Sequence, residues 1–351
     1  LASLISIDAM LEYGSATPPA PLFSPLVIVI FIACVAGAAA LLQCALVAAI
    51  IKRTRNGLYC LILQLIVADF VLLSASIGPE IWTTNAKTWD FGKSTCVTFR
   101  GLGVFASTAS LYLVVAIALH TLATINLEEK VATQNKRSTI IDDESRSSRH
   151  SLVANSDTST PTRTMNVDYR LTTNTKVPII PPSLFIWFLS GSLCIPEFAL
   201  STTVPLDHDI IVCGLVDSGH RFNIYSMLAI FNFFIPTFIM SVAGVLVGFK
   251  LSSKHFRKND KESVSALKYS LSLILVYFIM CSPRSLLCVY EIYSNNYSDR
   301  LKNENNIFLT INLMCSSVYL VSILLKPLLC ITLIPRIRNK FSLYSGNVVE
   351  V

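Results

Sequence analysis

Seven long stretches of mostly apolar residues alternate with polar segments along this 351-residue chain. Each stretch reaches the roughly 20 apolar residues that a helix needs to cross a bilayer. Lipid offers backbone groups no hydrogen-bond partners, so continuous segments of this length are expected to be helical. The pattern predicts an all-α membrane protein with a bundle of seven transmembrane helices over residues 25–334, at 25–51, 58–82, 97–125, 183–204, 222–249, 264–292 and 307–334.

Lys and Arg residues predict the orientation of the bundle. Nineteen lie after spans one, three and five and in the tail 335–351, five lie in the opposite connections, and residues 1–24 contain none. Short loops rich in these residues stay in the cytoplasm, so the N-terminal tail is expected outside the cell and the C-terminal tail inside. The sequon at Asn296 falls in a loop that this topology places outside, where it is expected to be glycosylated.

Composition narrows the class of protein. The chain is 53% hydrophobic and 14% charged, against about 25% charged in a soluble domain. Its net charge of +6 is explained by cytoplasmic loops, so no nucleic-acid partner is expected. The sequence contains no metal-ligand spacing or nucleophile motif that indicates an enzyme or a cofactor. These features predict a multi-pass protein of the plasma membrane.

Two cysteines stand apart from the others. Eight of the ten cysteines lie within the predicted spans, where a thiol behaves as a small apolar group. Cys96 lies at the outer end of span three, and Cys213 lies in the outer loop before span five. Both face the oxidising compartment, which favours a disulfide; two unpaired thiols are the alternative.

The connection between spans three and four is unusually long. Residues 126–182 are rich in Ser, Thr, Asn, Lys and Arg and poor in aromatic residues, which predicts a disordered cytoplasmic loop. Its serines beside arginines at 146–151 are suited to regulation by phosphorylation. A solvated linker is the alternative.

Several spans carry short motifs in a fixed order along the chain. The second span carries Leu-Ile-Val-Ala-Asp, ending at Asp69, and Trp89 precedes Cys96. Spans four to seven contain, in this order, Trp187, Pro196, Pro236, Pro283 and Pro327. This ordered set resembles the pattern of the rhodopsin-like class of G-protein-coupled receptors. The resemblance covers nearly all of the chain except the insertion. It implies a receptor that transmits binding of an extracellular ligand to a G protein or an arrestin-like adaptor.

The positions of the class's activation switches differ from the pattern. The third-span Asp-Arg-Tyr motif is replaced by a triplet without arginine, and the sixth- and seventh-span motifs keep only their prolines. The positions concerned are His120, Thr121, Leu122, Cys281, Pro283, Pro327 and Cys330. These departures predict atypical activation and leave a non-signalling decoy or scavenging receptor as an alternative.

Ligand recognition is less defined by the sequence. Gly103 occupies the position of the aspartate that binds amines in this class, so an acidic small molecule or a peptide is the more expected ligand. Charged residues expected near the outer half of the bundle are costly in lipid and usually face a cavity or a partner: Glu80, Arg100, Glu197, Arg284 and Glu291. All except Glu80 are assigned to the predicted ligand pocket. Arg284 is the predicted anchor for an acidic group; an internal salt bridge to Glu197 or Glu291 is the alternative.

A second buried cluster follows from the resemblance. Asp69 and Ser110 occupy positions that help to bind sodium in this class, while the seventh-span asparagine is Lys326. The lysine ammonium is expected to replace the ion as a covalently tethered cation, unless its long stem reaches the membrane interface instead.

Two other classes of seven-helix membrane protein fit the sequence less well than a receptor. A transporter would show paired halves, which are not visible, and insect-type chemoreceptor channels have the opposite orientation. Residues 349–351, Val-Glu-Val, resemble a ligand of PDZ domains and predict a further cytoplasmic partner.

Overall fold

The computed structural model describes residues 23–51, 56–86, 88–150, 177–205, 211–215, 218–252, 261–294 and 305–346. Within these ranges, seven helical stretches are long and apolar enough to cross a membrane, as predicted. They consist of α2 (Pro25–Ile50), α3 (Gly57–Leu72) with α4 (Gly78–Ala86), α5 (Lys93–His150), α6 (Ile180–Leu200), α7 (Ser218–Ala229) with α8 (Ile235–Ser252), α10 (Lys261–Val276) with α11 (Ser282–Ser294), and α12 (Asn305–Leu333). Helix α13 (Pro335–Gly346) follows the seventh span.

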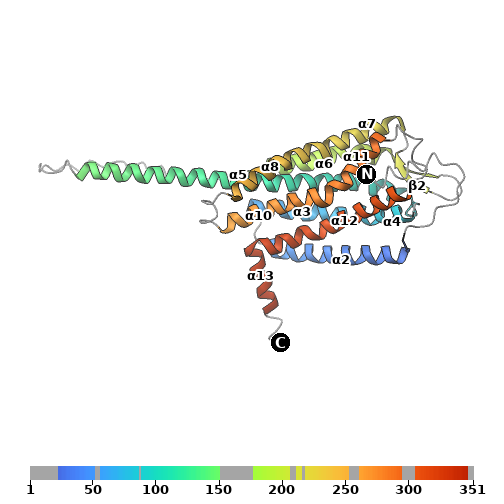
Figure 1. Cartoon of the computed structure of the whole chain (residues 1–351), viewed down its shortest axis with the longest axis horizontal. Coiled ribbons are helices and arrows are strands. Elements are labelled where there is room, and N and C mark those ends of the chain that lie inside the picture. The colour runs from blue at the N-terminus through green and yellow to red at the C-terminus, as the bar shows by residue number, and fades with distance from the viewer. Residues whose placement is uncertain are drawn as a thin grey trace. The chain divides into compact units, whose positions relative to one another are not determined.

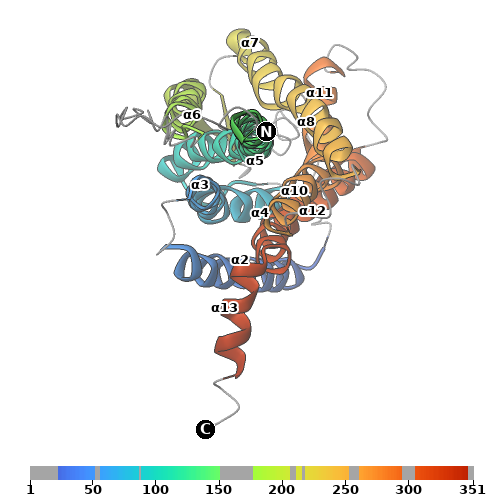
Figure 2. The ribbon, with the colours of Figure 1, turned by 90° about the vertical axis from the view of Figure 1, so that its left-hand side faces the viewer.

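The helices of the bundle run side by side, with the strand β2 (Ile211–Leu215) at one end and α13 at the other (Figure 1). We call these the hairpin end and the α13 end. Figure 2 shows α5 between α3 and α6 on one side and α8 and α10 on the other. The central position of α5 explains why its side chains take part in many of the polar contacts described below. On the outside of the bundle, large apolar side chains such as Phe188 and Phe249 are exposed, as lipid-facing residues are expected to be.

The segment after span three differs from its prediction. Residues 1–121 and 179–351 form one compact unit and residues 122–178 a second. Helix α5 continues to His150, so residues 126–150 are helical rather than disordered. This stretch contains no Gly or Pro, and its Glu, Lys and Arg residues favour a helix even where no apolar face is present. The remaining loop residues, 151–176, lie outside the described part of the chain.

Three spans contain a single widened helical turn, and each precedes a proline. The π-helical turns are Leu73–Ile77, Ile230–Phe234 and Tyr277–Cys281, and each ends two residues before Pro79, Pro236 or Pro283. Proline has no backbone N–H, and its ring clashes with the carbonyl four residues earlier. Widening the preceding turn relieves this clash without ending the helix. In spans five and six these turns also place side chains toward the cavity described below.

A β-hairpin closes the hairpin end. Strands β1 (Ser201–Pro205) and β2 pair antiparallel, with Thr203 opposite Cys213. The sequence prediction carried span four to residue 204, which is wrong for the last four residues, because α6 ends at Leu200. The β-branched run Thr202–Val204 favours a strand once β2 supplies a partner.

The predicted disulfide between Cys96 and Cys213 is confirmed. Both cysteines are fully buried beside Trp89 and Phe99. The Trp89 indole N–H donates to the Gly92 carbonyl at 2.8 Å, and Gly92 adopts a positive φ of 81° that favours glycine. The bond therefore fastens the hairpin to the start of α5 through a compact aromatic cluster.

Substitution of either bonded cysteine is expected to reduce surface delivery strongly. Cys96→Ala or Cys213→Ala opens a link across 117 residues and unfastens the hairpin, and loss of a native disulfide typically costs roughly 2 to 5 kcal/mol. Surface labelling on intact cells measures the effect, with Cys34→Ala, an exposed free cysteine, as the control. The double substitution should be no worse than either single one, and additive losses would contradict the pairing.

Candidate ligand cavity and its buried ion pairs

A cavity lies between the third, fifth, sixth and seventh spans. Its free space is about 870 Å³, including the part that opens to solvent. Most of its wall is apolar and comes from Leu111, Val114, Leu228, Ala229, Phe233, Leu273, Val276 and Val289. Among the described residues that line it, the charged side chains are Arg284 and Lys326.

Lys326 lies in a buried cluster with the two residues predicted to surround it. Its ammonium Nζ lies 2.8 Å from Asp69 Oδ1 and 2.8 Å from Ser110 Oγ, and the Ser110 hydroxyl donates to Asp69 Oδ1 at 2.6 Å. All three residues are at most 6% exposed. The structure thus brings together spans two, three and seven at this point, and the lysine stem does not extend to the membrane interface. Lys326 and Ser110 line the cavity, whereas Asp69 lies behind them.

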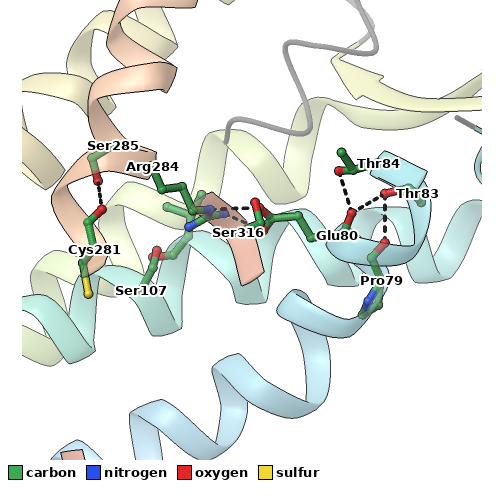
Figure 3. A network of polar contacts seen from close by, with 10 residues as sticks. Pro79, Glu80, Thr83, Thr84, Ser107, Cys281, Arg284, Ser285 and Ser316 are labelled. Carbon is green, nitrogen blue, oxygen red and sulfur yellow. Dashed lines mark hydrogen bonds and ion pairs between the residues drawn. The ribbon is translucent and has the colours of Figure 1, made fainter. Parts of the chain in front are cut away.

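Arg284 forms a second buried ion pair, shown in Figure 3. Its Nε donates to Glu80 Oε1 at 2.9 Å, its Nη2 donates to Glu80 Oε2, and the Ser316 hydroxyl donates to the same carboxylate at 2.9 Å. The guanidinium lies over the Tyr319 ring, 4.6 Å from its centroid. An internal salt bridge was one sequence-based alternative for Arg284. Among the described side chains its partner is Glu80 of α4, whereas Glu197 pairs with Arg100.

Arg100 and Glu197 form a third pair, nearer the disulfide. Arg100 Nε lies 2.7 Å from Glu197 Oε2, and both side chains are fully buried. Arg100 Nη2 donates to the Tyr225 hydroxyl at 2.7 Å, and Nη1 donates to the Cys213 carbonyl at 3.5 Å. One side chain of α5 therefore joins α6, α7 and the hairpin. Neither member of the pair is among the residues that line the cavity, and their predicted role in ligand binding stays a prediction.

The comparison with known families agrees with this geometry. The family described as the 7 transmembrane receptor (rhodopsin family) matches residues 167–329, which include the fourth to sixth spans and most of the seventh. This part of the chain is therefore similar to that family. No curated protein matches the chain. Members of the family are signalling receptors with an extracellular ligand and G-protein or arrestin partners, and they are not enzymes.

Several switch positions make contacts within the described part of the chain, at the α13 end and beside the cavity. The Thr121 hydroxyl, at the position of the family's arginine, accepts a hydrogen bond from Ser270 of α10 at 3.0 Å. Cys330, at the position of the seventh-span tyrosine, contacts the Tyr269 hydroxyl. Cys281 donates to Ser322 at 3.5 Å. Short neutral contacts between the third, sixth and seventh spans thus occupy the place of the charged and aromatic groups that the family pattern contains.

The remaining switch and pocket residues are distributed as follows. His120 packs against Gly57, where an added Cβ would lie 2.7 Å from His120 Nε2. Leu122 begins the second unit of the chain. Gly103 is half-buried and does not line the cavity. The Glu291 side chain, the sequon at Asn296 and the C-terminal residues 347–351 lie outside what the structure describes.

Several residues of the site were not identified from the sequence. Glu80 is an intramembrane carboxylate, a signal that marks it as a possible partner for Arg284. Ser316 and Asn232 carried no such signal, because single polar residues are common in transmembrane helices. The Asn232 amide accepts a hydrogen bond from Thr108 at 2.9 Å, while its Nδ2 is buried without a partner beside the cavity.

Proposed function

We propose that this protein is a cell-surface receptor with its N-terminus outside, in which a ligand enters the cavity from the hairpin end and shifts the bundle between two packings. The observation that supports this most is the extent of the cavity, which is lined both by Arg284 and by the Lys326 cluster. A ligand there contacts spans five, six and seven together, and differential contact with two arrangements is what shifts a population.

The Lys326 ammonium serves, in this proposal, as a built-in cation at the position where relatives hold sodium. It supplies a positive charge to Asp69 at 2.8 Å and cannot diffuse away. The arrangement that buries this pair is therefore favoured at every sodium concentration. Ligand binding has to work against a fixed ion pair rather than an exchangeable ion.

At the α13 end, the hydrogen bond between Thr121 and Ser270 connects spans three and six. A neutral hydrogen bond contributes about 0.5 to 1.5 kcal/mol to stability, so this connection breaks more easily than a charged contact would. The absence of arginine at this position also favours a second candidate, a receptor that binds its ligand without activating a G protein. A G protein, an arrestin-like adaptor and a PDZ domain at residues 349–351 are the candidate cytoplasmic partners.

Two measurements test the receptor function. A tag placed before Phe23 is expected to be accessible on intact cells, whereas a tag within residues 151–176 should require permeabilisation. A screen of acidic small molecules and peptides, read on several G proteins and on adaptor recruitment in parallel, is expected to give a ligand-dependent signal. Reversed tag accessibility would contradict the receptor, and ligand binding without any signal would favour the decoy.

A further inference from the structure

The two ion pairs at the cavity have the same orientation relative to it. Arg284 and Lys326 line it, whereas their carboxylate partners, Glu80 and Asp69, do not. Glu80 and Asp69 are each 1% exposed. Both ion pairs are neutral as units, but each turns its positive end toward the cavity. Among the described lining residues there is no Asp or Glu to oppose them.

These groups also retain unused hydrogen-bond donors. A guanidinium has five N–H groups, and the contacts of Arg284 with Glu80 use Nε and one N–H of Nη2, so toward the described residues one N–H of Nη2 and both N–H groups of Nη1 remain. The Lys326 ammonium donates to Asp69 and Ser110 and has a third N–H. Asn232 Nδ2, on the fifth span, is buried without a partner. Spans five, six and seven therefore each offer a hydrogen-bond donor to an acceptor placed in the cavity.

We infer that the ligand of this receptor is an apolar organic acid, with a carboxylate held by Arg284 and a hydrocarbon or aromatic body packed on the cavity wall. The inference rests on the proposed receptor function and names the ligand's chemical class. A carboxylate is an acceptor at both oxygens, matches the fork of a guanidinium and gives stronger hydrogen bonds than a neutral group. The apolar wall matches the body and offers little to a peptide backbone, which needs both donors and acceptors.

Matched compounds separate the effect of the ligand's carboxylate charge on binding from the effect of the ligand's shape. The full-length receptor, purified into nanodiscs, is titrated with straight-chain acids of eight to sixteen carbons and with phenylalkanoic acids. The primary amide and the amine of the same length serve as partners for each acid. Because a charged hydrogen bond exceeds a neutral one, at least one acid is expected to bind about tenfold to hundredfold more tightly than its amide, and the amine least.

Variants place the carboxylate within the cavity. Arg284→Gln alone leaves Glu80 unpaired and can fail to fold, so the test uses Glu80→Gln with Arg284→Gln, which keeps the site neutral. This double variant is expected to abolish the preference for the acid. Asn232→Asp keeps the acceptor for Thr108 but replaces the free donor with a negative charge, and it is expected to weaken acid binding at least tenfold while sparing the amide. Glu262→Gln with Arg336→Gln, which removes an exposed ion pair away from the cavity, is the matched control.

The outcomes distinguish the ligand class from the signalling function. The inference is overturned if no acid in the series binds, if the amide or amine binds as tightly as the acid, or if the neutral double variant keeps the preference. Any of these results can occur while another ligand activates the receptor, in which case the receptor function stands alone. Acid binding with the expected pattern but without a response from any effector supports the ligand class and contradicts signalling.

Discussion

Asp69→Ala is expected to abolish most surface expression, because it leaves the Lys326 ammonium buried without its counter-charge. Lys326 is 6% exposed, and Ser110 is its remaining partner among the described residues. Breaking a buried pair by removing one member typically costs about 3 to 5 kcal/mol. Surface labelling and the melting temperature of the purified receptor measure the loss. Glu262→Gln, which breaks an exposed pair, is the control and should change neither.

A double-mutant cycle tests whether the two charges act as a unit. If they do, the double variant Asp69→Ala with Lys326→Ala is expected to lose less stability than the two single variants lose in sum. The reason is that the double variant contains no buried charge without a partner. Lys326→Asn restores the residue type found in sodium-binding relatives, and its thermal stability is expected to rise with sodium concentration at constant ionic strength. Additive losses in the cycle, with no sodium effect on Lys326→Asn, would refute the tethered-cation proposal.

Arg100→Met is expected to have a comparable effect at the hairpin end. It leaves Glu197 fully buried with no cation, and it also removes the donors to the Tyr225 hydroxyl and the Cys213 carbonyl. A loss of about 3 to 5 kcal/mol in the free energy of unfolding follows from the same cost of an isolated buried charge. The melting temperature of the purified receptor and the amount delivered to the cell surface measure this loss.

Replacing both members of this pair makes the test specific. Arg100→Met with Glu197→Leu substitutes an apolar contact of similar volume, and such replacements are often neutral relative to the buried pair. The double variant is therefore expected to recover most of the stability that Arg100→Met loses. If the double variant is as unstable as the single one, the stability comes from the contacts of Arg100 with Tyr225 and the hairpin rather than from its charge.

Much of the bundle could be predicted because the required information is local. A span is recognised from its length and apolar content, and the predicted ranges agree with the seven helices within a few residues at most ends. The prediction failed at Ser201–Val204, because a short β-branched run next to a helix does not reveal that a partner strand follows at Ile211. It also failed for residues 126–150, where composition indicated disorder although no residue there interrupts a helix.

The candidate site was predicted in part. The Asp69, Ser110 and Lys326 cluster followed from positions in a known family pattern, although 257 positions separate its two charged members. The Arg284 pair did not follow, because Glu80, Glu197 and Glu291 were all acidic residues at a similar depth. Glu197 forms an ion pair with Arg100, and this pairing is visible only once spans three and four are packed together.

The sequence by itself determined the seven spans, the disulfide and the residues whose charge demands a partner within the membrane. These properties depend on the residue and its neighbours along the chain, and on the cost of exposing a polar group to lipid. Only the tertiary structure decided which partner each charge takes and which ends of the ion pairs face the cavity. The rotation and axial shift of each helix determine those contacts, and packing against all neighbouring helices at once determines that rotation. The widened turns before Pro236 and Pro283 change it further, so the pairing of Arg284 with Glu80 could not be read from the order of residues.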